Sequence, residues 1–133
     1  MKSPLTVLVV EDDPETRSLT GEVFQAHGFE VLLADSVAAA STLLAQSRPA
    51  MVLLDLAMPG GDGMGLLRQI KGDPALKAIP VVLVTGVPRE SLPEDASLAL
   101  AVMRKPFDVA KLAQIVRTFS EKMAQGGAGR GAT

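Results

Sequence analysis

Short runs of branched aliphatic residues recur along this chain and predict five β-strands. The runs cover residues 5–10, 30–34, 51–56, 81–85 and 98–103. Most of them show no alternation of polar and apolar residues, which is typical of strands buried on both faces of a parallel sheet. The run at 98–103, in which Leu and Ala alternate, is the least regular of the five.

Apolar residues at helical spacing lie between these strands. In the first such segment, Asp13 is a capping residue, Pro14 suits the first helical position, and Gly28 favours a helix end. The predicted buried stripe of this helix consists of Leu19, Val23 and Phe24.

Three further helical segments follow. Ser36 can cap the second, which carries Ala40, Leu43 and Leu44 and closes before Pro49. The third carries Leu66, Leu67 and Ile70 and ends near Gly72. The last begins after Asp108, and its apolar positions are Val109, Leu112, Ile115, Val116, Phe119 and Met123. Any helix in residues 88–97 is interrupted, because Pro93 lies inside that stretch.

Strands that alternate with helices at ordinary connection lengths indicate an open α/β sheet. Right-handed crossovers then place helices on both faces of the sheet. With 133 residues the chain has room for one domain, which we expect at residues 1–125. Residues 126–133 contain four glycines and no apolar anchor, so we expect a flexible tail there.

Composition narrows the functional classes. The absence of Cys excludes disulfides, thiolate zinc sites and a cysteine nucleophile. Thirteen basic and 15 acidic residues leave a net charge of −2, without the basic excess of a nucleic-acid binder. No apolar run is long enough for a membrane span, and no secretory signal is recognisable. We therefore expect a cytoplasmic protein that binds neither nucleic acid nor membrane.

Reactive side chains collect at the carboxyl ends of the predicted strands, where ligands bind to open parallel sheets. The first strand is followed by Asp12 and Asp13, the third carries Asp55, the fourth ends in Thr85, and Lys105 follows the fifth. If these strands are neighbours in the sheet, their end groups converge on one patch. Taken singly, Asp13 would also serve as a helix cap, and Glu11 and Asp12 would be solvated loop acids.

Three carboxylates in one patch repel one another and favour a divalent cation. Oxygen ligands alone suit a hard ion, for which Mg²⁺ is the natural choice. Thr85 could donate a hydrogen bond to a phosphoryl oxygen, and Lys105 could neutralise a second one. Asp55 is held between Leu54 and Leu56 on a buried strand, so it is the best-fixed nucleophile for forming an aspartyl phosphate.

These segments resemble the receiver domain of two-component response regulators over roughly residues 5–123. The matching segments are Val9-Val10-Glu11-Asp12-Asp13-Pro14, Leu53-Leu54-Asp55-Leu56-Ala57-Met58-Pro59, Val84-Thr85-Gly86 and Lys105-Pro106-Phe107. Four motifs at matching strand ends are a much stronger signal than any one of them. The resemblance implies a flavodoxin-like, doubly wound parallel sheet of five strands in the order 2-1-3-4-5.

The resemblance also implies roles for individual residues. Asp55 would accept a phosphoryl group from a phosphohistidine on a sensor histidine kinase or a histidine phosphotransfer protein. Asp12 and Asp13 would hold Mg²⁺ together with Asp55 and the backbone carbonyl of Ala57. Thr85 would be the switch hydroxyl and Lys105 the phosphate-pairing lysine, with the Lys105–Pro106 bond usually cis in the family.

The family pattern further implies a signalling module, a monomer or weak dimer, rather than a turnover enzyme. It would catalyse only its own phosphorylation and dephosphorylation and switch a surface that binds an output partner. One departure concerns that switch: Val102 stands where receivers often carry Tyr or Phe, so an aromatic switch cannot operate.

Three alternatives remain open from the sequence. A degenerate receiver would bind partners without being phosphorylated. A phosphatase of the haloacid dehalogenase type would need a second Asp where this chain has Ala57. A flavodoxin relative would need a phosphate-binding loop after the first strand, where Glu11, Asp12 and Asp13 would repel phosphate.

Overall fold

A computed structural model of the chain describes residues 5–58, 62–106 and 108–118. Its five strands form one parallel sheet in the order β2-β1-β3-β4-β5, as predicted. The strands are β1 (Thr6–Val10), β2 (Glu30–Ala34), β3 (Met51–Asp55), β4 (Val81–Thr85) and β5 (Ala101–Arg104). Four of them agree with the predicted runs to within one residue at either end. β5 begins three residues later than expected, because the preceding residues form a 3₁₀ turn.

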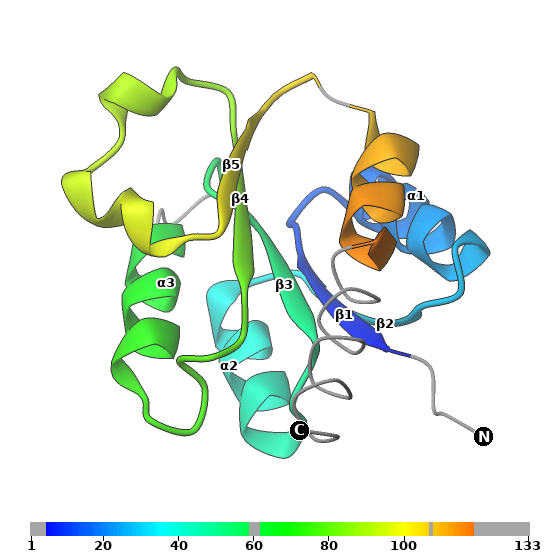
Figure 1. Cartoon of the computed structure of the whole chain (residues 1–133), viewed down its shortest axis with the longest axis horizontal. Coiled ribbons are helices and arrows are strands. Elements are labelled where there is room, and N and C mark those ends of the chain that lie inside the picture. Colours follow the sequence, from blue (N-terminus) through cyan, green and yellow to red (C-terminus); the bar gives the residue numbers. More distant parts are fainter. Residues whose placement is uncertain (1–4, 59–61, 107, 119–133) are drawn as a thin grey trace, which may run out of the picture.

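Helices cover both faces of the sheet (Figure 1). They are α1 (Pro14–Ala26), α2 (Val37–Gln46) and α3 (Gly63–Gly72), and residues 109–118 are also helical. The caps follow the sequence: Asp13 and Ser36 accept backbone N–H groups at the starts of α1 and α2, and Asp108 accepts from the N–H of Lys111 at 3.2 Å. Gly28 follows α1 with a φ of 91°, a conformation that favours glycine.

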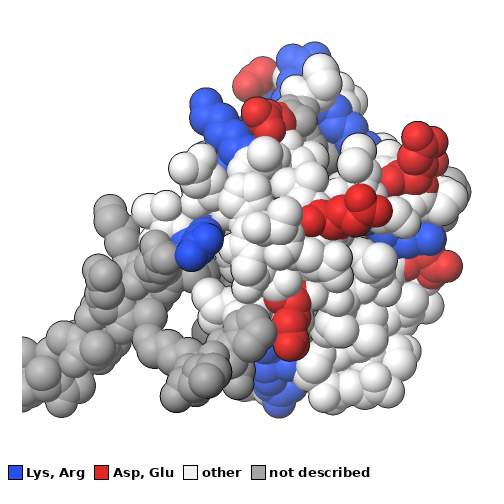
Figure 2. All heavy atoms as spheres, turned by 90° about the vertical axis from the view of Figure 1, so that its right-hand side faces the viewer, with Lys and Arg blue, Asp and Glu red and all other residues white. Residues whose placement is uncertain are grey.

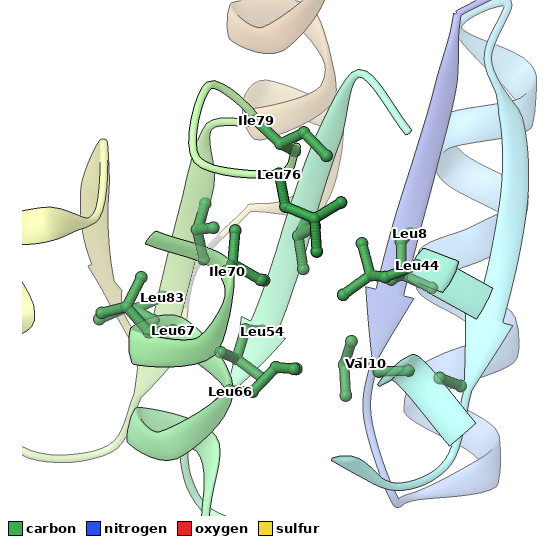
Figure 3. Close-up of a cluster of buried hydrophobic side chains, with 14 of the residues drawn as sticks. Leu8, Val10, Leu44, Leu54, Leu66, Leu67, Ile70, Leu76, Ile79 and Leu83 are labelled. Carbon is green, nitrogen blue, oxygen red and sulfur yellow. The ribbon is translucent and has the colours of Figure 1, made fainter. Parts of the chain in front are cut away.

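Two apolar layers hold the helices against the sheet. On one face, α2 and α3 bury leucines such as Leu44, Leu66 and Leu67 against alternate residues of the strands (Figure 3). On the other, Phe24 of α1 and Leu112 of the last helix pack on the remaining strand residues. Because each strand residue points to the opposite face from its neighbour, a strand position determines which layer a side chain joins.

The buried stripe of α1 differs from the prediction. Leu19 is 58% exposed, whereas Thr20 and Gly21 face the sheet beside Phe24. The missing side chain of Gly21 allows close approach, since an added Cβ would lie 3.2 Å from Leu33. The stripe is thus rotated by one residue. In the last helix, Ile115 is also exposed. The other predicted stripe residues that the structure describes, such as Leu112 and Val116, are buried or half-buried.

The segment between β4 and β5 contains two short 3₁₀ helices rather than an α-helix. They are η1 (Arg89–Ser91) and η2 (Glu94–Leu98), preceded by Pro88 and Pro93 respectively. Pro93 has no N–H to donate and so interrupts a continuous helix, as the sequence predicts. Arg68 of α3 forms a two-bond ion pair with Asp95, which joins η2 to α3.

The described helices include none with the length and apolar character of a membrane span. Acidic and basic side chains are interspersed on the face of the molecule that carries α1 (Figure 2). The expected end of the domain at residue 125, the tail at 126–133, and the predicted apolar positions Phe119 and Met123 lie outside the described residues.

Candidate phosphoryl-acceptor site

Asp55 is the last residue of β3 and is only 3% exposed. Its Oδ1 accepts a hydrogen bond from the backbone N–H of Ala57 at 2.9 Å. Its Oδ2 accepts from the ammonium group of Lys105 at 2.9 Å. Each carboxylate oxygen of this buried aspartate therefore has a donor. These two hydrogen bonds fix the direction of the carboxylate. It lies at the carboxyl end of β3, where the sequence predicted it.

Lys105 reaches Asp55 because its own backbone continues the sheet past β5. Its N–H donates to the carbonyl of Thr85 at 2.8 Å, and the Lys105–Pro106 peptide bond is cis. Burial acts to lower the pKa of Lys105, but its hydrogen bond and charge attraction to Asp55 outweigh that effect and raise the pKa. The lysine stays a cation beside the carboxylate.

The structure gathers a different set of acids from the predicted one. Glu11, Asp12 and Asp55 each place one carboxylate oxygen within 4.8 Å of the others. Asp13 is instead exposed and caps α1, because its Oδ2 accepts from both the N–H and the hydroxyl of Thr16. Those two hydrogen bonds hold the pKa of Asp13 below its ordinary value. The structure therefore places Glu11, and not Asp13, beside Asp12 and Asp55.

Strand periodicity explains the position of Glu11. The N–H of Glu11 donates to the carbonyl of Ala34 at 3.0 Å, which extends the pairing of β1 and β2 by one residue. Val9 and Leu53 share one apolar layer, so Glu11 and Asp55, each two residues further on, project on that same side of the sheet. A period of two points to Glu11 only once the strand geometry is known to continue to residue 11, and the hydrogen bond to Ala34 in the structure is what shows this.

The proximity of Glu11 to Asp55 alters the titration of both. Burial and the neighbouring Asp55 raise the pKa of Glu11 from 4.5 to about 7. Burial also acts to raise the pKa of Asp55, but the Glu11 carboxyl, the Ala57 N–H and Lys105 outweigh it and hold that pKa below its ordinary value. Without a cation, therefore, Asp55 is ionised near neutral pH, whereas Glu11 gains a proton as the pH falls through about 7.

These acids suit a hard divalent cation. Glu11, Asp12 and Asp55 offer three carboxylate oxygens that lie close together, and two of the three residues are buried. Such a set of oxygen ligands suits Mg²⁺ rather than a soft metal. The positive charge of a bound cation would also lower the pKa of Glu11 and favour its ionised form, against the burial that raises that pKa. The carbonyl of Ala57 stays a predicted fourth ligand; the structure shows its N–H bound to Asp55.

Thr85 ends β4, the strand next to Asp55. Within the β3–β4 pairing Asp55 lies opposite Val84, so Thr85 is one position beyond it. The hydroxyl oxygen of Thr85 accepts the N–H of Val87 at 3.1 Å, and the side chain is buried. The structure thus places the hydroxyl at the predicted strand end, where it holds the first turn of the β4–β5 segment.

A cavity of about 280 Å³ opens beside Asp55 and Lys105. Its walls include the strand residues Val9, Leu53 and Val84 on the α1 side of the sheet, together with Thr16 and Thr20 of α1. Glu11 also lines it. The Asp55 carboxylate therefore lies at the boundary between an apolar interior and the acid-lined end of the sheet, where charge interactions are stronger than in water.

Fold and site together define a flavodoxin-like α/β domain with a lysine-paired aspartate at its acidic edge. The family model of the response regulator receiver domain matches residues 7–117. The chain therefore belongs to the receiver domains of two-component response regulators. This result agrees with the resemblance carried by the sequence motifs and favours neither the phosphatase nor the flavodoxin alternative.

Several characterised proteins are similar to this chain. Sporulation initiation phosphotransferase F of Bacillus subtilis is 30% identical over 115 residues, which cover 85% of this chain and 91% of that protein. The response regulator Rre1 of Synechocystis is 32% identical, but the match covers 88% of this chain and only 52% of Rre1. Receiver domains of this kind therefore occur both as most of a protein and as part of a longer one.

Among solved structures, the response regulator TrrA of Thermotoga maritima in complex with Mg²⁺ and BeF has a TM-score of 0.75 with 25% identity. The superposition covers 86% of this chain and 97% of TrrA. The similarity thus extends over nearly the whole receiver fold.

Proposed function

We propose that this chain accepts a phosphoryl group on Asp55 from a phosphohistidine of a sensor histidine kinase or phosphotransfer protein, in a reaction that requires Mg²⁺. The observation that carries the proposal is the state of Asp55. It is a buried, ionised carboxylate with Lys105 on one oxygen and the Ala57 N–H on the other, beside Glu11 and Asp12.

In the proposed reaction an oxygen of Asp55 attacks the phosphorus of the phosphohistidine. The new bond joins Asp55 to phosphorus, the P–N bond breaks, and the imidazole nitrogen keeps its electron pair and takes up a proton. Lys105 then pairs with a phosphoryl oxygen instead of the carboxylate alone. Glu11, Asp12 and Asp55 would hold Mg²⁺, which when bound neutralises charge on the phosphoryl oxygens.

The same site supports a switching role rather than turnover of a substrate. A phosphoryl group on Asp55 would add negative charge beside Lys105 and near the end of β4, where Thr85 carries a hydroxyl donor. To donate to that group, the Thr85 hydroxyl would reorient and weaken its bond to the N–H of Val87. We propose that this change shifts the β4–β5 segment toward a form that binds an output partner.

Phosphoryl uptake from phosphoramidate, a small donor with a P–N bond, tests the proposal. With Mg²⁺ present, intact-mass spectrometry should show one phosphoryl group on the wild type and none on the Asp55→Asn variant. Asp35→Asn is the matched control, because Asp35 is an exposed acid that follows β2 at the same edge of the sheet. EDTA should abolish uptake by the wild type.

Two results would contradict this function. Equal labelling of wild type and Asp55→Asn would place the phosphoryl group elsewhere. A folded wild type that takes up no phosphoryl group from phosphoramidate or from phosphorylated histidine kinases would favour the degenerate receiver, a binding module that is not phosphorylated.

A further inference from the structure

Arg17 folds back from the first turns of α1 onto the loop that carries the acidic residues. Its Nη1 donates to the carbonyl oxygen of Glu11 at 3.0 Å and to that of Asp12 at 3.1 Å. Its backbone N–H donates to the carbonyl of Asp13 at 2.8 Å. One residue therefore satisfies three consecutive carbonyl groups where the chain leaves β1.

These contacts matter because the loop has few other constraints. Once the chain leaves the sheet, its carbonyl groups lose their partners in the strand ladder. The N–H of Glu11 is still paired with β2, and the N–H of Asp13 bonds to the side chain of Glu11. The peptide units that set the directions of Glu11 and Asp12 are otherwise held through their carbonyls by Arg17.

We propose that Arg17 is a positioning residue for the divalent cation: it fixes the loop backbone so that the carboxylates of Glu11 and Asp12 converge with that of Asp55. The inference rests on the proposed function, since it takes these three acids as the cation site. Like-charged carboxylates repel one another and would diverge on a free loop. Groups that hydrogen-bond to the metal ligands, and not to the metal, orient those ligands and so change the affinity for the cation.

The charge of Arg17 acts in the opposite direction to its hydrogen bonds. A guanidinium near the site repels a divalent cation, whereas the hydrogen bonds hold the ligands in place. Arg17 is half-buried, so water partly screens its charge, but its bonds to the two carbonyls are not replaced by any side chain among the described residues. We therefore expect the positioning effect to exceed the repulsion.

The test compares Mg²⁺ affinity, measured from amide NMR shifts during titration, in the wild type and three variants. Arg17→Met removes the donors and the charge but keeps length and helix propensity. Arg17→Lys keeps the charge and a group with N–H donors. Arg48→Met is the control, because Arg48 is exposed and precedes β3 at the other edge of the sheet.

We expect Arg17→Met to weaken Mg²⁺ binding by about tenfold or more. Arg17→Lys should recover most of that loss, and Arg48→Met should bind as the wild type does. Thermal unfolding in EDTA separates this role from a purely structural one, which would lower the melting temperature and leave the Mg²⁺ dissociation constant unchanged. If Arg17→Met does not fold, Arg17→Gln takes its place with the same expected direction.

A folded Arg17→Met protein that binds Mg²⁺ as tightly as the wild type, or more tightly, would overturn the inference. So would a lysine variant that recovers none of the affinity. In both cases the wild type still binds Mg²⁺ and the proposed function stands. A wild type without any Mg²⁺-dependent shifts would overturn the cation site itself, and this inference with it.

Discussion

The ammonium nitrogen of Lys105 lies 2.9 Å from Oδ2 of Asp55, although 50 positions separate the two residues in the chain. The contact depends on the parallel sheet, which brings the ends of β3 and β5 to the same edge on either side of β4. It leaves Asp55 ionised inside the fold and places a cation beside the oxygen to which the proposed phosphoryl group would bond. The Asp55–Lys105 pair therefore stabilises a buried charge and also serves the proposed phosphoryl transfer.

Replacement of Lys105 with Met should slow phosphoryl uptake from phosphoramidate by about 10²- to 10³-fold, because no cation then balances the charge that develops on the transferred group. The initial rate, followed by intact mass, measures the effect. Lys111→Met is the control, since Lys111 is exposed on the helix that follows. A Lys105→Met rate equal to that of the control would remove the lysine from the mechanism.

The metal-free protein should become less stable as the pH rises from about 4.5 to about 7. The pKa of Glu11 is about 7 in the folded chain, against 4.5 as the reference value, so the folded state binds more protons across this window. The loss is at most about 3 kcal/mol and levels off above pH 7. Asp55, whose pKa lies below its ordinary 3.8, is already ionised throughout the window.

Urea unfolding in EDTA at pH 5 and pH 8 measures this dependence. Glu11→Gln should flatten it, whereas Glu22→Gln, at an exposed position on α1, should leave it unchanged. The explanation fails if the wild type is more stable at pH 8 than at pH 5, or if the Glu11→Gln variant keeps the wild-type slope.

Loss of the Arg68–Asp95 ion pair should loosen η2 without unfolding the domain. The side chains of Arg68 and Asp95 are 50% and 38% exposed, so water screens their charges and the pair adds little to global stability. Among the described residues it is nevertheless the ion pair that connects η2 to α3. In Arg68→Met, hydrogen exchange at amides of residues 94–98 should accelerate while the melting temperature hardly changes. Arg89→Met, on the exposed η1, is the control; equal exchange in both variants would argue against a tether.

Leu67 of α3 and Leu19 of α1 should differ sharply in their contribution to the stability of the folded chain. Leu67 of α3 is fully buried, so Leu67→Ala should cost about 2–5 kcal/mol through lost burial and the cavity left behind. Leu19 of α1 is mostly exposed, and Leu19→Ala should change stability by no more than about 0.5 kcal/mol. Chemical denaturation compares them directly, and similar costs would mean that α1 packs through Leu19 after all.

Much of the architecture could be predicted because it depends on local pattern. Continuous aliphatic runs located four strands to within a residue, and Asp13, Ser36 and Gly28 marked helix ends through their own hydrogen bonds or backbone conformation. Pro93 indicated the interrupted helix. Asp55 and Lys105 followed from the rule that parallel strands end at one edge.

The sequence alone thus determined the order of the elements, the family and the two residues of the central ion pair. Only the tertiary structure decided that Glu11 joins Asp12 and Asp55 while Asp13 serves as a cap, and that Thr20 and Gly21, not Leu19, face the sheet. The physical reason is that the sequence does not fix the rotation of a strand end or a helix about its own axis. The direction of a side chain at the end of a strand or around a helix depends on contacts with distant segments. The local sequence does not show those contacts.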